Sequence, residues 1–249
     1  MFIYFWILRL AALLGHKKAR LLVEGQGKAL AELQEWVLTI GDDKVVWFHA
    51  ASVGEFEQAR PIIERLRKDR PQTKILLSFF SPSGYEIRKN YEGADYIFYL
   101  PIDTPLNVKR FLDIAHPEIA IFVKYEFWLN YLYELKARNV RTFVISAIFR
   151  ADSVFFKWYG SRWRQALDSY EQIFVQNEES QALLHRIGFD NVIIAGDTRF
   201  DRVAAIAKAA KKIDIVERFK ADSRLFVAGS TWGPDEDILQ ELINSNPDI

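Results

Sequence analysis

Short apolar runs alternate with amphipathic segments over most of the chain, from Val45 onward. Each run has the length and the turn-forming boundaries of a buried strand. Segments with helical spacing of apolar residues separate the runs, and this order predicts βαβ units in a parallel, doubly wound sheet. We therefore expect a Rossmann-like α/β fold. After the run at Val45, the expected strands are 74–80, 96–100, 119–123, 142–146, 173–176 and, more weakly, 192–195, and the expected helices lie near 55–69, 83–90, 105–115, 127–138, 155–169 and 178–187.

Polar side chains follow the ends of most expected strands. Because right-handed crossovers place the carboxyl ends of parallel strands at one edge of the sheet, these clusters should meet there. Taken singly, each cluster is typical of a turn or a helix start. Together they favour a cleft for a substrate rich in hydroxyl or anionic groups, where the strand order reverses. The clusters are 52–55, 81–84, 124–128, 146–150, 176–179 and 196–201.

The first cluster contains Glu55, a carboxylate placed where a helix should begin. Ser52 and Gly54 before it suit a tight turn and a helix cap. Glu55 would then lie at the mouth of the sheet, where open α/β folds bind ligands. The same residues also fit an ordinary strand-to-helix junction, in which an acid complements the helix dipole. Spacing alone leaves both interpretations open.

The composition excludes several kinds of site. Lys plus Arg and Asp plus Glu number 33 each, which gives no overall basic charge for nucleic-acid binding. The chain has no cysteine, so disulfides, thiolate zinc sites and cysteine nucleophiles are excluded. Its four histidines show none of the spacings of a histidine metal site. We expect no metal site.

Several common motifs are also absent. The sequence has no GxGxxG after its first expected strand, no GxxxxGK[ST] and no GxSxG. Their absence argues against a dinucleotide cofactor, a Walker-type nucleotide site and a serine hydrolase. Chemistry would then depend on a carboxylate assisted by cations. The candidate bases are Glu55 and Glu126, and the candidate cations beside developing negative charge are Lys124, Arg150 and Arg199.

The first fourteen residues are apolar except for Arg9, and basic residues follow at 17, 18 and 20. A run of this length is shorter than the ~20 residues that span a bilayer. Basic residues after the apolar run are in the wrong order for a cleavable signal peptide. We expect residues 1–20 to form a membrane-associating helix, because the basic residues would attract anionic headgroups and keep the rest of the chain cytoplasmic. The alternative is a helix packed on the domain surface.

The character of the sequence changes between residues 200 and 222. An Ala/Lys-rich helical stretch over 201–212 precedes a polar connector at 220–224, and a new strand is expected at 225–228, followed by a short helix. A single βα unit buries too little surface to form its own core. We therefore expect an N-terminal domain over 21–210, and over 211–249 a linker and the start of a second domain, most of which this chain would lack.

Several stretches, taken in order, resemble the Kdo transferases, which move 3-deoxy-D-manno-octulosonic acid (Kdo) from CMP-Kdo to lipid A precursors. The resemblance begins at the apolar-then-basic N-terminus and covers nearly the whole chain. The box HAASVGE at 49–55 and the box EFWLN at 126–130 are fairly specific at this spacing. The other matching stretches are SPSG (81–84), QNEE (176–179), GDTRFD (196–201) and GSTW (229–232).

The resemblance implies a reaction, its partners and its location. Kdo transferases are inverting, metal-independent glycosyltransferases of the GT-B type, without a cofactor. Their N-terminal domain binds the lipid acceptor, and their C-terminal domain binds most of the CMP donor. The resemblance therefore implies that this chain is an acceptor domain at the cytoplasmic face of the inner membrane, acting in lipopolysaccharide synthesis.

The resemblance also implies roles for individual residues. Glu55 matches the general base, and we expect its carboxylate to be ionised because it lies at a helix N-terminus. Lys124, Glu126 and Arg199 match positions that stabilise the transition state or the substrate. The implied substrate-binding residues are Ser52, Gly54, Ser83, Gly84, Ser146, Arg150 and Asn177.

The sequence departs from the family pattern at two of these positions. The family box Glu-x-Glu-x-Trp-Pro-Asn reads KYEFWLN at 124–130, so Lys124 replaces its first acid. Arg199 replaces a lysine, which keeps the charge and adds a planar fork. Two alternatives stay open: a GT-B transferase for another sugar, and a catalytically silent lipid- or sugar-binding domain. We also expect this chain alone to be inactive, since most contacts to CMP would lie beyond Ile249.

Overall fold

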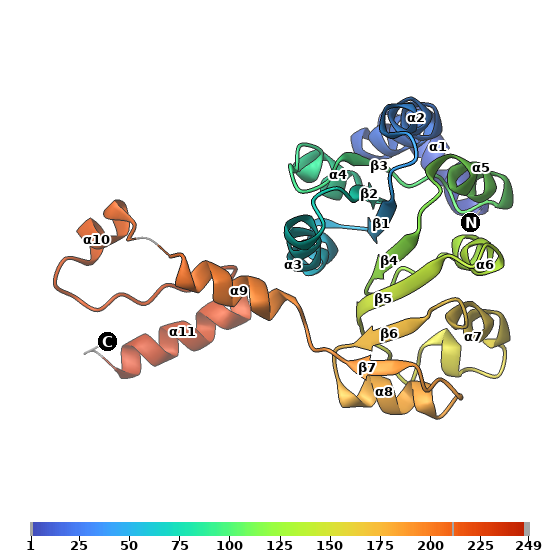
Figure 1. Ribbon diagram of the computed structural model, residues 1–249. Helices are drawn as coiled ribbons and strands as arrows, with labels where there is room; N and C mark the ends of the chain where they lie inside the picture. Colours follow the sequence, from blue (N-terminus) through green and yellow to red (C-terminus); the bar gives the residue numbers. More distant parts are fainter. Residues whose placement is uncertain (1, 211, 247–249) are drawn as a thin grey trace. The chain divides into compact units, whose positions relative to one another are not determined.

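The structure is a computed structural model that describes residues 2–210 and 212–246, and it divides the chain into two compact units, Met1–Ala204 and Ala205–Ile249. The first unit contains a seven-stranded parallel sheet with helices on both faces (Figure 1). The predicted Rossmann-like α/β fold is confirmed. The strands are β1 (Val45–Ala50), β2 (Lys74–Phe79), β3 (Tyr96–Tyr99), β4 (Ile119–Val123), β5 (Arg141–Ala147), β6 (Gln172–Val175) and β7 (Val192–Ile194), in the spatial order β3-β2-β1-β4-β5-β6-β7.

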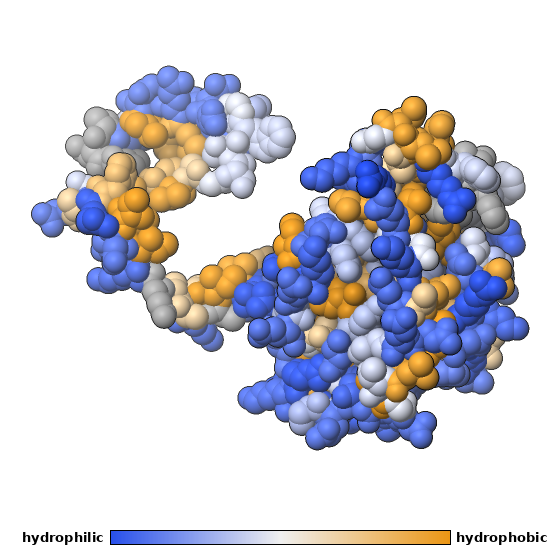
Figure 2. Space-filling view, turned by 90° about the horizontal axis from the view of Figure 1, so that it is seen from above, coloured by the Kyte–Doolittle hydropathy of each residue, from blue (hydrophilic) through white to orange (hydrophobic). Residues whose placement is uncertain are grey.

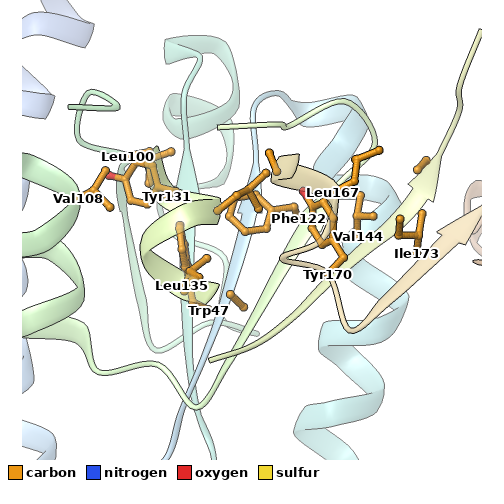
Figure 3. Packing of buried hydrophobic residues seen from close by; sticks show 14 of the residues in the cluster. Trp47, Leu100, Val108, Phe122, Tyr131, Leu135, Val144, Leu167, Tyr170 and Ile173 are labelled. Carbon is orange, nitrogen blue, oxygen red and sulfur yellow. The ribbon is translucent and has the colours of Figure 1, made fainter. Parts of the chain in front are cut away.

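The central strand β1 shows why this sheet is apolar on both faces. Val45 and Trp47 belong to the larger buried cluster, part of which is shown in Figure 3. This cluster includes side chains of the helices α5 (Pro105–Ala115), α6 (Leu129–Ala137) and α7 (Ser161–Leu167). Val46 and Phe48 point the other way, into a cluster with Phe56 of the helix α3 (Val53–Asp69). Successive side chains of a strand face opposite sides, so a strand covered on both sides reads as a continuous apolar run.

The helices after β1 match the amphipathic segments of the sequence, with one exception. The segment 155–169 is divided into a short 3₁₀ turn, η1 (Val154–Phe156), and the helix α7 (Ser161–Leu167). Between them the backbone of Gly160 approaches the carbonyl of Val154 so closely that a Cβ atom would lie 1.9 Å from that oxygen. The other helices are α3 (Val53–Asp69), α4 (Pro82–Arg88), α5 (Pro105–Ala115), α6 (Leu129–Ala137) and α8 (Glu178–His185).

Two helices precede the sheet. The apolar N-terminus forms α1 (Phe2–Leu13), and a 24-residue helix, α2 (Lys17–Ile40), follows it. The sequence patterns did not predict α2, which crosses the expected boundary at residue 20. Its buried residues include Leu22 and Leu33, and Gln26 donates a hydrogen bond to the carbonyl of Leu100. Among the described residues, no helix has the length and apolar character needed to cross a membrane.

The regular elements described in the second unit are helices. The helix α9 (Arg199–Lys208) carries the chain into this unit, where α10 (Asp214–Lys220) and α11 (Gly233–Ser245) follow. The strand predicted at 225–228 is wrong: these residues form no regular structure. A single strand has no neighbour to satisfy its backbone groups. Phe226 and Val227 are exposed, and hydrophobic residues show on the surface of this unit (Figure 2).

Substitution of Gly84 should show that close packing at the start of α4 requires a glycine there. A Cβ atom on this buried glycine would lie 2.6 Å from the Phe79 ring and 3.3 Å from the Cα atom of Ser52. We expect Gly84→Ala to lower the free energy of unfolding by about 1–3 kcal/mol, measured by urea unfolding. Gly54→Ala is the matched control, because the nearest atom to its Cβ would be 4.0 Å away and stability should not fall. Equal losses in both variants would contradict this interpretation.

Candidate active site at the β1–β4 junction

The strand order reverses between β1 and β4. From β1 the chain proceeds outward through β2 and β3 on one side and resumes with β4 on the other. At such a point the loops at the carboxyl ends of the two strands diverge and leave a crevice for ligands. The loop after β1 leads to Glu55 at the start of α3, and the end of β4 leads to Lys124 and Glu126. The fold therefore places three of the predicted residues beside this crevice.

Glu55 serves as part of the cap of α3. Its Oε2 atom accepts a hydrogen bond of 2.5 Å from the backbone N–H of Ala51, while the side chain of the cap residue Ser52 makes no capping bond. The carboxylate thus reaches back over the helix start in the manner of one half of a capping box. The ordinary structural interpretation of Glu55 is correct as far as this contact goes.

The pKa of Glu55 is raised from 4.5 to about 7, mainly by burial and next by the nearby charge of Glu126. Hydrogen bonds from the backbone of Ala51 and Ser52, and the positive charge of Lys124, oppose the rise. The helix start therefore does not keep this carboxylate fully ionised at neutral pH, contrary to the expectation from the sequence. A carboxylate that titrates near pH 7 has the proton affinity expected of a general base or acid.

Glu126 is held by two ring nitrogens. Its Oε2 atom accepts a 2.6 Å hydrogen bond from Nε1 of Trp128 and lies 3.1 Å from Nε2 of His49. The Glu126 side chain is 12% exposed, whereas His49 is completely buried. His49 Nδ1 lies 2.8 Å from the hydroxyl of Ser78, which also accepts a bond from Trp47. A carboxylate in this setting has a fixed position beside Glu55.

The sequence patterns did not single out His49, Ser78 or Trp128 as functional residues. His49 and Ser78 read as interior positions of two buried strands, and Trp128 reads as part of an amphipathic segment. Only the pairing of β1 with β2 and β4 brings the three side chains together, with His49 beside Ser78 in the strand register. The one signal in the sequence was a polar residue inside each of two apolar runs, His49 in the first and Ser78 in the second.

Two predicted site residues have left-handed backbones. Lys124 has φ 66° at the end of β4, and Ser146 has φ 52° near the end of β5. This conformation is strained for residues other than glycine and is often found at functional sites. Ser146 is buried, and its hydroxyl lies 3.2 Å from that of Thr198. The two strained residues thus lie at the carboxyl ends of two adjacent strands, on the side of the crevice.

Arg199 is paired with its neighbour Asp197. Its Nε atom lies 2.9 Å and one Nη atom 2.5 Å from Oδ2 of Asp197, and this guanidinium lowers the pKa of Asp197 to about 2. Asp197 also accepts a bond from the side-chain amide of Gln58, and the backbone carbonyl of Gln58 accepts a bond from the hydroxyl of Thr198. The segment after β7 is therefore anchored to α3, within one turn of Glu55.

The remaining predicted residues make local contacts. Asn177 caps α8 by accepting a 2.9 Å bond from the N–H of Ser180, and the hydroxyl of Ser83 lies 2.7 Å from that of Ser81. Arg150 is exposed in the loop after β5. Gly54 is exposed and Gly84 is buried against β2. Their roles in substrate binding stay predictions.

A cleft of about 620 Å³ adjoins Glu126. Trp128, Tyr133 and Trp163 give it an aromatic lining, and Asp103 and Arg162 add charge. This volume and this mixture of apolar walls with a few polar groups are typical of sites for small molecules. Within residues 2–210 and 212–246, no cluster of three or more His, Asp or Glu side chains is arranged to hold a metal ion.

Known proteins resemble this chain in sequence. The family model described as 3-deoxy-D-manno-octulosonic-acid transferase (kdotransferase) matches residues 20–202. The 3-deoxy-D-manno-octulosonic acid transferase of Haemophilus influenzae is 27% identical over 201 residues, which cover 78% of this chain and 46% of that protein. The enzyme of the same name from Chlamydia trachomatis serovar A is 27% identical over 82% of this chain and 49% of its own length. The chain spans about half the length of the curated relatives it matches.

Solved structures share the fold. A UDP-GlcNAc 2-epimerase from Neisseria meningitidis, bound to UDP-GlcNAc, matches with a TM-score of 0.54 and 16% identity over 83% of this chain and 64% of its own. A similar protein from Listeria monocytogenes, titled a UDP-N-acetylglucosamine 2-epimerase, gives a TM-score of 0.56 and 12% identity over 84% of this chain and 61% of its own. At these identities the likeness concerns the fold alone.

Ionisation of Glu55 should oppose folding. The unfolded chain loses this proton near pH 4.5 and the folded chain near pH 7, so stability declines as the pH rises between these values. We expect Glu55→Gln to match the original chain near pH 4.5 and to exceed its free energy of unfolding by roughly 3 kcal/mol at pH 8, measured by urea unfolding. Glu64→Gln on the same helix breaks an exposed ion pair with Arg60 and should not gain stability over the original chain as the pH rises. A pH-independent difference for Glu55→Gln would contradict the raised pKa.

Proposed function

We propose a function from one premise: the chain belongs to the 3-deoxy-D-manno-octulosonic-acid (Kdo) transferase family. On this premise it is the acceptor side of a glycosyltransferase that moves Kdo from CMP-Kdo to a lipid A precursor in lipopolysaccharide synthesis. The observation that carries the proposal is Glu55, a carboxylate at the strand-order reversal with a pKa of about 7. The neighbouring cleft beside Glu126 offers room for part of a polar, acylated acceptor.

Glu55 would act as the general base of an inverting transfer. An acceptor hydroxyl attacks the anomeric carbon of Kdo on the face opposite CMP, and its proton passes to the Glu55 carboxylate as the new C–O bond forms. The bond to the CMP phosphate breaks, and CMP leaves with the electron pair. A nucleotide phosphate is a good leaving group, so the step requires neither an acid partner nor a metal ion.

The cations near the crevice would assist in two ways. Lys124 lowers the pKa of Glu55 and so keeps a larger share of this base ionised. Its ammonium group could also bind a phosphate or carboxylate of a substrate. Arg199, now paired with Asp197, presents a fork suited to the same groups. The proposed role of Lys124 differs from that of the acid that stands at this position in the family pattern.

We also propose that α1 lies on the cytoplasmic face of the inner membrane. Its exposed residues include Trp6, Leu10 and Leu13, at 65%, 58% and 85% of their surface. Basic residues of α2 follow directly, at 17, 18 and 20. An apolar helix face beside basic residues is typical of segments that lie in the interface of an anionic bilayer. An acylated acceptor would then be reached from the membrane surface.

The alternatives differ in what they require of Glu55. A GT-B transferase for another sugar would keep Glu55 as its base and change the residues that contact the donor. A silent binding domain needs no titrating base, and the raised pKa of Glu55 favours the catalytic reading. We further propose that CMP is bound mainly by the part of the family's length that this chain does not match, so that this chain alone does not transfer Kdo.

Replacing the base should affect kcat more than binding. We expect Glu55→Gln, in the full-length protein, to lower kcat by about 10²–10⁴-fold with a small change in the KM for the acceptor. The assay would measure Kdo transfer from CMP-Kdo to a lipid A precursor. The activity of the original enzyme should rise with pH to a plateau above about 7, because the base must be ionised. Glu64→Gln, exposed on the same helix, should keep its activity. A Glu55→Gln enzyme with undiminished kcat would refute the assignment of the base.

Charges on the apolar face of α1 should weaken membrane binding. We expect the double substitution Leu10→Glu and Leu13→Glu to reduce binding to vesicles with anionic lipids by about tenfold or more, measured by flotation. Leu38→Glu is the control for an added charge, because Leu38 is 80% exposed on α2 and receives one negative charge away from α1. The membrane proposal fails if the double variant binds as well as the control.

A further inference from the structure

A chain of hydrogen-bonding groups runs from the core to Glu126. Trp47 Nε1 donates to the Ser78 hydroxyl over 2.8 Å, and this hydroxyl lies 2.8 Å from His49 Nδ1. On the far side of the ring, His49 Nε2 lies 3.1 Å from Glu126 Oε2. All members before Glu126 are buried. Buried polar groups destabilise the folded chain unless each of them has a hydrogen-bond partner.

While Glu126 is a carboxylate, the contact between its Oε2 atom and His49 Nε2 is attractive only if Nε2 carries hydrogen. If His49 Nε2 carries hydrogen, it donates to the Glu126 carboxylate, and Nδ1 either accepts from Ser78 or, in the charged ring, donates to it. If Nε2 carries no hydrogen, its lone pair faces a carboxylate oxygen at 3.1 Å, which is repulsive. Trp128 Nε1 lies 2.6 Å from Glu126 and 3.0 Å from His49 Nε2, so its proton goes to the carboxylate.

We propose that His49 is a positioning residue, which uses Nε2–H to hold the Glu126 carboxylate beside Glu55. The hydroxyl of Ser78 is the partner of the other ring nitrogen, Nδ1, in either state of the ring, and Trp128 supplies the second donor to the carboxylate. The inference rests on the proposed function, in which Glu55 is the base, and adds to it a residue that never contacts the substrate. The order is that of a catalytic triad: the buried His49 orients the Glu126 carboxylate, and Glu126 in turn acts on Glu55.

The consequence is control over the proton affinity of the base. The charge of Glu126 is one cause of the raised pKa of Glu55, and it acts only while the carboxylate stays in place. The other charged group that faces Glu55 is Lys124, and the backbone of α3 contributes N–H groups. Around Glu126 stand His49, Trp128 and the buried ring of Tyr170, whose pKa Glu126 helps to raise.

The test is a titration of Glu55 in this chain, which needs no turnover. With ¹³C-labelled glutamate, the Glu55 carboxyl signal is identified by its loss in Glu55→Gln, and its midpoint should lie near 7. We expect Glu126→Gln to lower the midpoint by about one unit or more, and His49→Phe to lower it as well. The double variant should fall no further than Glu126→Gln alone, because His49 acts through Glu126. His49→Gln, which restores an N–H donor, should return the midpoint toward 7.

A control separates positioning from loss of packing. The centre of the Phe111 ring lies 4.7 Å from that of Trp47. Phe111→Leu therefore disturbs the packing of Trp47 without removing a hydrogen bond, and it should leave the midpoint of Glu55 unchanged. If Phe111→Leu shifts the midpoint as much as His49→Phe, or if His49→Phe leaves it unchanged, the proposal is wrong. It is also wrong if Glu126→Gln has no effect.

The unsubstituted chain offers a second readout, which stands even if His49→Phe does not fold. ¹⁵N spectra of labelled histidine show which ring nitrogen carries hydrogen. Hydrogen on Nε2, in the neutral or the charged ring, supports the proposal, and a bare Nε2 overturns it. These results are independent of the kinetics of Glu55→Gln, so the positioning role and the proposed transfer reaction can fail separately.

Discussion

The parallel pairing of β1 with β4 is the contact on which the candidate site depends. In this register His49 lies opposite Phe122, so the chain after β4 passes over the end of β1 four residues later, at Glu126. The strand order reverses at the same place, which opens the loops to ligands. A shift by one residue would turn His49 to the other face of the sheet and separate it from Glu126. The apolar burial of both faces fixes the register and thereby the site.

Two opposing effects act on Glu55, and their balance gives it a useful proton affinity. The cap of α3 supplies N–H groups that favour the charged carboxylate, whereas burial and Glu126 favour the neutral acid. Burial is the largest of these effects, so the group titrates near neutrality. A free helix cap of this type would stay ionised. The same side chain therefore completes a helix start and remains able to take up a proton.

The sequence was sufficient to predict the parts of the structure that follow from periodicity. Every predicted strand up to β7 is present with ends within one residue, because a strand buried on both faces leaves a continuous apolar run. Glu55 and Glu126 could be named as candidates because they lie in the loops or helix starts that follow such runs. The partners of His49 could not be found, since they come from another strand and another loop. The prediction of a strand at 225–228 was wrong because an apolar pattern alone is not sufficient: among the described residues of this unit, no neighbouring strand is present to pair with it.

The helix that carries Glu55 is held from two directions, and this explains how strained residues persist at its edge. On one side α3 packs against β4, because Phe56 and Val123 belong to the same buried cluster, and Lys124, with its left-handed backbone, continues β4 toward Glu126. On the other side Gln58 binds Asp197 and Thr198, and Thr198 meets the hydroxyl of Ser146, the second left-handed residue. Strained conformations last only where surrounding contacts determine them. The first turns of α3 therefore receive their position from β4 and from the segment after β7 together. This keeps the base in one place, while burial and the nearby charges set its proton affinity.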